Sequence, residues 1–128
     1  MHKTINPASL GAPFARYSHA VEVAAGLRWV FCSGQLGMDA SGHVPAGAEA
    51  QADICFAAIE ALLAEAGMAM ADLVRLNAYV SGREHLAAYM ASRDRHVASP
   101  PPASTLMIVG GFARPEFFVE VEAVAARG

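Results

Sequence analysis

Apolar and polar residues alternate most clearly near the carboxyl end of the chain. In the run Phe117–Val124, Val119, Val121 and Ala123 fall on one side of an extended strand, whereas Glu120 and Glu122 fall on the other. A second strand-like run, Thr105–Val109, precedes it. Carboxylates avoid burial unless a partner pairs with them, so the periodicity alone favours a solvated outer face for the two glutamates.

The rest of the pattern predicts three more strands and two helices. Strands are expected over Ala20–Ala24, Leu27–Cys32 and Leu73–Ser81, and helices over Glu49–Ala66 and Glu84–Val97. A glycine directly after the first helix and three prolines after the second are typical of helix ends.

Each predicted helix carries an apolar stripe at i, i+3, i+4 spacing, which indicates the side that packs on the sheet. The stripe of the first helix consists of Ile54, Cys55, Ala58, Ile59, Leu62 and Ala66. The stripe of the second helix consists of Leu86, Tyr89, Met90, Arg93 and Val97.

The order of elements is β-β-α-β-α-β-β, with one more short strand possible near Val44 and an abrupt strand end at Ser33-Gly34-Gln35. This order predicts a single α+β domain over residues 1–128, with one sheet and two helices on one of its faces. Apolar residues make up 55% of the chain and charged residues only 16%, which is low for a soluble domain. We therefore expect the other face of the sheet to be covered by another copy of the chain.

Charge and composition exclude several classes of function. The formal net charge is −3 without any basic run, which argues against a nucleic-acid partner. No apolar run reaches the length of a membrane span, and residues 1–18 contain no hydrophobic signal core. Cys32 and Cys55 are isolated thiols rather than a CxxC pair, so we expect reduced core residues in a cytoplasmic protein.

Motif spacing alone does not identify a reaction. The five histidines show no metal-binding spacing, so no metal site is expected. Gly110-Gly111 is more typical of a bulge than of a phosphate-binding loop. Cys32, within a strand of bulky residues, is more typical of a core position than of a nucleophile.

Several segments together resemble the Rid family, also called YjgF/YER057c/UK114. The resemblance extends over nearly the whole chain, and the closing run Val119–Ala125 is its most specific part. The other segments are Tyr17-Ser18 followed by His19-Ala20-Val21, then Ser33-Gly34-Gln35, Gln51 and Gly67 of the first helix, Arg75–Val80, and Pro102-Ala103-Ser104-Thr105.

The resemblance implies a chorismate-mutase-like α+β fold and a homotrimer, with the sheets forming a central barrel and a ligand cleft at each subunit interface. It also implies hydrolysis of small reactive enamines and imines to a keto compound and ammonium, without a cofactor. Such intermediates damage other enzymes, so the implied role is metabolite damage control.

The resemblance further implies the roles of individual residues. Glu120 matches the carboxylate that positions a water molecule, which turns the expectation for this residue from a solvated face to a functional one. Tyr17 matches an aromatic lid, and Gly34 and Leu106 match positions that contact the substrate through the backbone. Thr105, beside Leu106, is a further substrate-binding candidate.

The chain departs from the family at the substrate-carboxylate clamp. Active members carry an arginine directly after the Pro-Ala pair, where this chain has Ser104. A serine hydroxyl can donate a hydrogen bond but cannot form a charged bidentate pair. Arg16 or Arg93 could supply the charge from elsewhere. Arg93 could instead reach the surface or pair with Asp94 or Glu84.

Two hypotheses follow with nearly equal weight. The first is a Rid-type hydrolase in which Glu120 positions water. The alternative is a non-catalytic family member that binds a small metabolite in the inter-subunit cleft, because the arginine is missing. Chorismate mutase activity is weaker, since its dianionic substrate needs several cations, and a ribonuclease role finds no basic patch.

Overall fold

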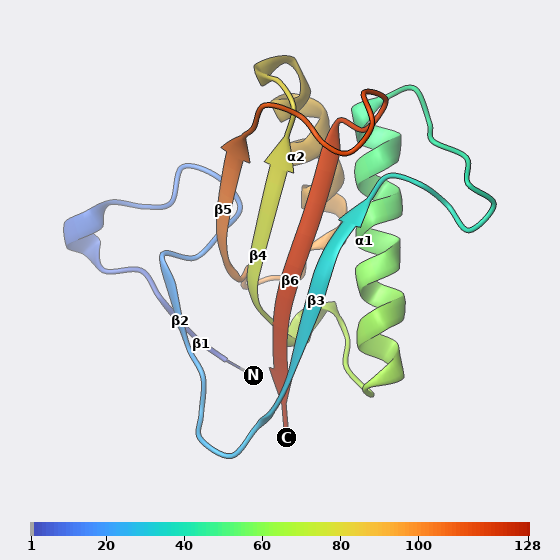
Figure 1. Ribbon diagram of the computed structural model, residues 1–128. Helices are drawn as coiled ribbons and strands as arrows, with labels where there is room; N and C mark the ends of the chain where they lie inside the picture. The colour runs from blue at the N-terminus through green and yellow to red at the C-terminus, as the bar shows by residue number, and fades with distance from the viewer. Residues whose placement is uncertain (1) are drawn as a thin grey trace.

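The computed structural model describes residues 2–128, and its centre is a mixed four-stranded sheet. The strands lie side by side in the order β3 (Arg28–Leu36), β6 (Val119–Arg127), β4 (Leu73–Val80) and β5 (Ala103–Ile108) (Figure 1). Strand β6 is antiparallel to both β3 and β4, whereas β5 is parallel to β4. The last strand of the chain is therefore an interior strand of the sheet.

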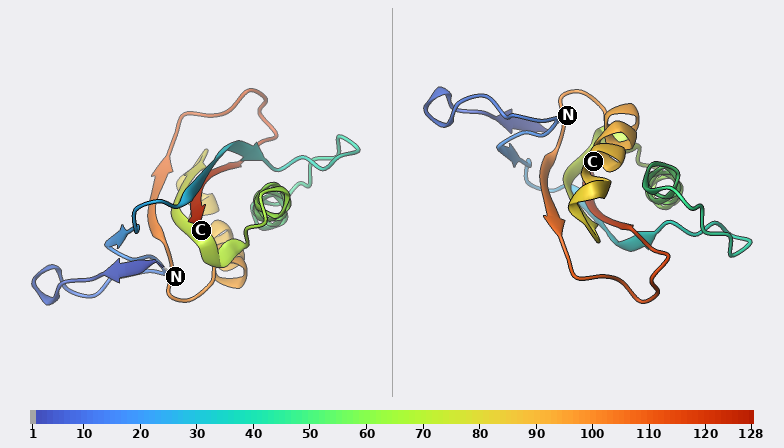
Figure 2. Two further views of the ribbon diagram at one scale, coloured as in Figure 1. Left: turned by 90° about the horizontal axis from the view of Figure 1, so that it is seen from below. Right: turned by 90° about the horizontal axis from the view of Figure 1, so that it is seen from above.

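Both helices lie on the same face of this sheet (Figure 2). They are α1 (Ala48–Glu65) and α2 (Leu86–His96). A short antiparallel pair, β1 (Lys3–Ile5) and β2 (Ala20–Glu22), stands apart from the main sheet. The arrangement confirms the predicted α+β class with two helices on one face. No helix among residues 2–128 has both the length and the apolar character that a membrane crossing requires.

The core lies between the helices and the alternate residues of β6. Val119 and Val121 have no exposed surface, and Glu120 and Glu122 between them are half-buried on the opposite, uncovered face. The predicted alternation is thus confirmed. It follows that the uncovered face of the sheet carries the two carboxylates.

Strand β3 is longer than the sequence predicts. It continues through Ser33-Gly34-Gln35 to Leu36, and its register against β6 shifts between Cys32 and Gln35. Such a bulge accommodates extra residues without ending the strand. The segment β1 was not expected, and the short strand considered near Val44 does not form, because Val44 lies in the loop before α1.

The stripe predicted for α1 is partly wrong. Cys55 and Ile59 are fully buried as expected, but Leu62 is 41% exposed while Leu63 is fully buried in its place. Alanine occurs on every side of this helix, so the apolar pattern does not fix its rotation to within one residue. Of the stripe predicted for the second helix, Tyr89 and Arg93 on α2 and Val97 directly after its end are buried, whereas Leu86 and Met90 are only partly buried.

A buried glutamine joins α1 to two loops. Gln51 has no exposed surface, and its amide nitrogen donates hydrogen bonds to the carbonyl oxygens of Pro45 and Glu116, both at 2.8 Å. Its amide oxygen accepts one from the backbone N–H of Phe118, also at 2.8 Å. These bonds hold the residues that lead into β6, and hence the start of the strand that carries Glu120.

We expect Gln51→Leu to lower the free energy of unfolding by about 2–4 kcal/mol, because it removes the three hydrogen bonds that this fully buried amide makes to backbone groups. Gln35→Leu is the matched control, since the Gln35 amide donates only to the nearby Ser33 carbonyl at an exposed position. Its cost should stay within about 0.5 kcal/mol. Equal losses in urea denaturation of the two variants would contradict this role for Gln51.

Candidate functional site

One groove gathers most of the predicted binding residues. It has a volume of about 470 Å³ and lies between β5, α2 and the loop that precedes β2. The predicted residues that line it are Tyr17, Arg93, Ser104, Thr105 and Leu106. They come from three parts of the chain that are distant in sequence, and the fold brings them together.

The alternation of β5 divides its residues between two faces. Ser104 and Leu106 face the helix-covered side, where the α2 residues of the groove lie. The Thr105 hydroxyl instead accepts a 2.6 Å hydrogen bond from the Arg75 guanidinium on β4. The side chain of Thr105 is thus engaged on the uncovered face, and its main chain borders the groove.

Tyr17 lies in a loop that is anchored beside the start of β5. The Ser18 backbone N–H donates to the carbonyl oxygen of Pro102 at 2.9 Å, and its hydroxyl donates to that of Pro101 at 2.6 Å. The Tyr17 ring meets Phe14 edge-on, with centroids 5.6 Å apart. The two aromatic rings therefore form one side of the groove opening.

Arg93 is a buried cation in the wall of the groove. Its side chain is only 6% exposed, and its Nε and Nη2 atoms both donate to Oδ1 of Asp94 at 3.1 Å. Its Cζ atom lies 5.9 Å from the centre of the Tyr89 ring. Burial raises the pKa of Tyr89, so this phenol stays neutral under the guanidinium. Arg93 therefore pairs with Asp94 and also lines the groove, and its role as a replacement for the clamp stays a prediction.

Arg16 lies outside the groove. Its Nη2 atom donates to the carbonyl oxygen of Val97 at 3.1 Å, just beyond the end of α2. It borders a neighbouring hollow that also contains Asp94. Of the two arginines that the sequence offered as cations for the substrate, only Arg93 lines the same groove as Ser104.

Glu120 on β6 and Gly34 on β3 lie together at a second candidate site, which is separate from the groove. A side chain at Gly34 would collide with the carboxylate, because an added Cβ would lie 2.8 Å from Cδ of Glu120. Glycine thus permits the close approach of this carboxylate to the β3 backbone. Within one protomer, β4 and β5 lie on the far side of β6 from Gly34, and the groove is on the helix-covered side.

The two glutamates of β6 differ in their partners. The Glu122 carboxylate accepts hydrogen bonds from the Tyr79 hydroxyl at 2.6 Å and from the Asn77 amide at 3.3 Å. The Glu120 carboxylate has no hydrogen bond or ion pair to any of residues 2–128. Glu120 is therefore the carboxylate that remains available to a ligand or to water.

Most of the apolar lining of the groove was not identified from the sequence. Phe14, Ala15, Leu86, Met90 and Ile108 complete its walls, and Phe14 is 93% exposed. The sequence singled out only Leu86 and Met90, as members of the α2 stripe. An isolated apolar residue in a loop or at a strand end gives no functional signal, because single exposed apolar residues are common on protein surfaces.

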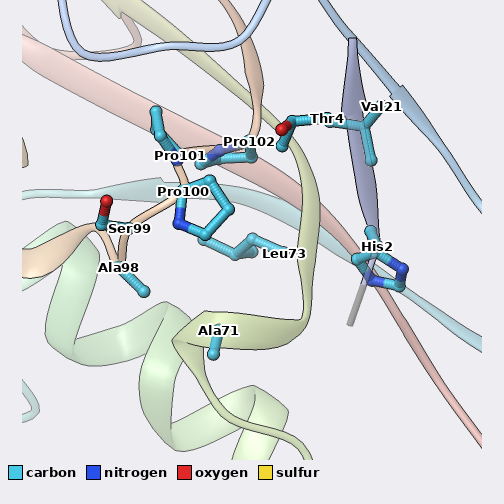
Figure 3. A pocket seen from close by; sticks show the side chains of 10 residues that line it. All are labelled: His2, Thr4, Val21, Ala71, Leu73, Ala98, Ser99, Pro100, Pro101 and Pro102. Atoms are coloured by element: carbon cyan, nitrogen blue, oxygen red, sulfur yellow. The ribbon is translucent and has the colours of Figure 1, made fainter.

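A smaller cavity lies under the β1–β2 pair (Figure 3). Its volume is about 30 Å³, and the prolines Pro100, Pro101 and Pro102 form one side of it. His2 on another side has its Nε2 atom 3.0 Å from the carbonyl oxygen of Asp72. This volume has room for a water molecule but not for an organic substrate. Residues 2–128 also contain no group of three acidic, histidine or cysteine side chains that could hold a metal ion.

Comparison with known proteins identifies the family. The model of the endoribonuclease L-PSP family matches residues 8–127, and the chain belongs to this family, which is the YjgF/Rid family. The resemblance inferred from the sequence is confirmed. No curated protein matches the sequence significantly.

Solved structures show the same relationship. A protein of unknown function of the Rid family, YyfB from Yersinia pestis, is 33% identical, with 98% of each chain covered and a TM-score of 0.85. RidA from the Antarctic bacterium Psychrobacter sp. is 28% identical, covering 91% of this chain and 92% of its own, with a TM-score of 0.73. A YjgF family member from Neisseria meningitidis is 29% identical over 88% of each chain, with a TM-score of 0.71.

The different engagement of the two glutamates can be tested by titration. The hydrogen bond to Glu122 raises the pKa of Tyr79, because it stabilises the protonated phenol beside a carboxylate. We expect Glu122→Gln to lower this pKa toward the ordinary tyrosine value of about 10, measured by tyrosinate absorbance. Glu120→Gln, on the same face, should shift it much less. Equal shifts in the two variants would contradict the assignment.

Proposed function

We propose that this protein is a Rid-type hydrolytic deaminase that converts a small reactive enamine or imine to a keto compound and ammonium. The observation that carries the proposal is the Glu120 carboxylate, which packs on Gly34 and has no partner among residues 2–128. Membership in the Rid family and the similarity to a RidA structure support this class of reaction. The groove with Tyr17 and Arg93 offers a place for the substrate.

The reaction needs only acid–base chemistry. Glu120 accepts a proton from a water molecule as the water oxygen attacks the carbon of the protonated imine, which gives a neutral carbinolamine. The carboxylic acid then returns this proton to the nitrogen. Glu120 next takes the proton of the carbinolamine hydroxyl as the C=O bond forms and the C–N bond breaks, and it passes that proton to the departing ammonia, which leaves as ammonium. Backbone N–H groups near Gly34 and Leu106 are suited to stabilise the charge that develops on the substrate.

The proposed site requires two copies of the chain. Glu120 lies on the uncovered face, whereas the groove lies beside α2, so one protomer does not bring them together. Trp29 and Phe31 on β3 and Met107 on β5 are large apolar residues that are 47%, 75% and 52% exposed. We propose that a homotrimer buries this face and joins the groove of one subunit to Glu120 of the next. A cytoplasmic location is part of the same proposal.

One alternative is supported by a specific observation. With Ser104 in place of an arginine, the groove could bind a metabolite without catalysing its hydrolysis. The family name refers to an endoribonuclease, but an RNA substrate favours a positively charged surface and this chain has a net charge of −3. The charge supports a small-molecule ligand in either case.

We expect the protein to accelerate ammonium release from 2-iminopropionate that an amino-acid oxidase generates in situ. Glu120→Gln should lower kcat by about 10²–10⁴-fold, because it removes the general base. Glu122→Gln is the matched control and should keep most of the activity, since its carboxylate is engaged by Tyr79. Activity that survives Glu120→Gln would overturn the mechanism. No acceleration with any imine would leave the metabolite-binding alternative.

We also expect a trimer in light scattering, and dissociation of this trimer by Phe31→Asp, because the substitution places a charge within the proposed interface. Leu62→Asp is the control, since Leu62 is an exposed apolar residue on the outer side of α1. It should leave the assembly unchanged. A monomeric wild-type protein, or dissociation by both variants alike, would contradict the proposed interface.

A further inference from the structure

The groove has apolar walls and one buried cation. The side chains of Phe14, Leu86, Met90 and Leu106 contribute to the walls, and Arg93 is the only charged residue of the described chain that lines it. A volume of about 470 Å³ is within the usual range for small-molecule sites. A three-carbon ligand would fill a small part of this space and would leave the apolar walls in contact with water.

The guanidinium of Arg93 is held by one edge and open at the other. Nε and Nη2 both donate to Asp94, which fixes the plane of the group. Nη1 has no hydrogen-bond partner among residues 2–128, and it is not one of the buried polar atoms that lack a partner, so it reaches solvent. Because Arg93 lines the groove, this open edge presents N–H donors to a ligand anion there.

Asp94 orients Arg93 without occupying the groove. The Asp94 side chain is 53% exposed and borders the neighbouring hollow with Arg16, not the groove itself. The carboxylate thus neutralises part of the charge from outside and restricts the rotation of the guanidinium. Such restriction lowers the entropy cost of ligand binding.

We propose that the preferred ligand is a 2-imino acid with a bulky apolar arm, such as the imine of leucine. Arg93 binds the carboxylate through its open edge, and Phe14, Leu86, Met90 and Leu106 contact the arm. Ser104 leaves space between the cation and the walls because its side chain is small. This inference rests on the proposed function, since it names the substrate class of the same site.

The 2-oxo acids are suitable probes of this preference. They are stable, and they differ from the imines only in having oxygen in place of the imine nitrogen. Each buried methylene contributes about fourfold to affinity, so we expect the 2-oxo acid of leucine to bind roughly 10–100-fold more tightly than pyruvate. Methyl isobutyl ketone has the same arm without the carboxylate and should bind much more weakly than the leucine acid. Isothermal titration calorimetry on the intact assembly measures all three.

Variants distinguish the contribution of the Arg93 cation to binding from that of the apolar walls. Arg93→Met should lower the affinity for the 2-oxo acid of leucine at least tenfold and leave the affinity for methyl isobutyl ketone unchanged. Arg83→Met, at an exposed arginine outside the groove, should change neither affinity. Ser104→Arg should reverse the preference toward pyruvate, because it fills the groove and adds a second cation. This variant keeps the test decisive if Arg93→Met does not fold. Equal affinity for pyruvate and the leucine acid, or a leucine-acid affinity that Arg93→Met leaves intact, would overturn the inference.

The same measurements distinguish this inference from the proposed function. Binding does not require the general base, so the preference should be the same in Glu120→Gln. Binding of the leucine acid without hydrolysis of any imine would overturn only the proposed deaminase. Hydrolysis of short and bulky imines with equal kcat/KM would overturn only the proposed substrate class.

Discussion

Strand β6 has one face buried under the helices and the other on the uncovered side of the sheet, and the rest of the structure depends on this division. It pairs with β3 on one side and β4 on the other, and its residues Val119 and Val121 are fully buried under the helices. Its register therefore cannot slip by one residue without moving Glu120 and Glu122 into the core. The apolar face fixes the strand, and the fixed strand determines where the two carboxylates lie.

The residues around the two carboxylates then make Glu120 and Glu122 different from each other. Tyr79 and Asn77 engage Glu122, whereas Gly34 gives Glu120 space without giving it a partner. The β3 bulge places Gly34 at this point. An unengaged carboxylate on a face that also carries exposed Phe31 and Met107 is consistent with the proposed partner subunit, which would bring a substrate to it.

The predictable part of the fold follows from periodicity and helix-stop residues. The alternation of β4 and β6 and the glycine and prolines after the helices were sufficient for the two helices, the strands of the main sheet and the fold class, but not for β1. The rotation of α1 was not predictable, because alanines blur its stripe and Leu63 rather than Leu62 enters the core. The bulge in β3 was also missed, since Ser33-Gly34-Gln35 has the composition of a turn.

The site was predictable only where the chain resembles its family. The resemblance pointed to Tyr17, Gly34 and Glu120, but no pattern in the sequence decides whether Arg93 faces solvent or the groove. That depends on how α2 packs beside β5, which is a tertiary contact. Phe14 and Ile108 could not be found either, because they become neighbours only after folding.

In the proposed assembly, each site combines the groove of one subunit with Glu120 of another. The most direct test is to dissociate, mix and reassemble the variants Glu120→Gln and Arg93→Met, and to assay them on the imine of leucine well below its KM, where loss of the general base and loss of carboxylate binding both lower the rate. Each variant lacks a different half, so sites in mixed trimers that combine both intact halves should restore about one quarter of the wild-type activity on an imine substrate. A site contained within one protomer would be damaged in every subunit. In that case the mixture would be no more active than the two variants alone, which would contradict the account.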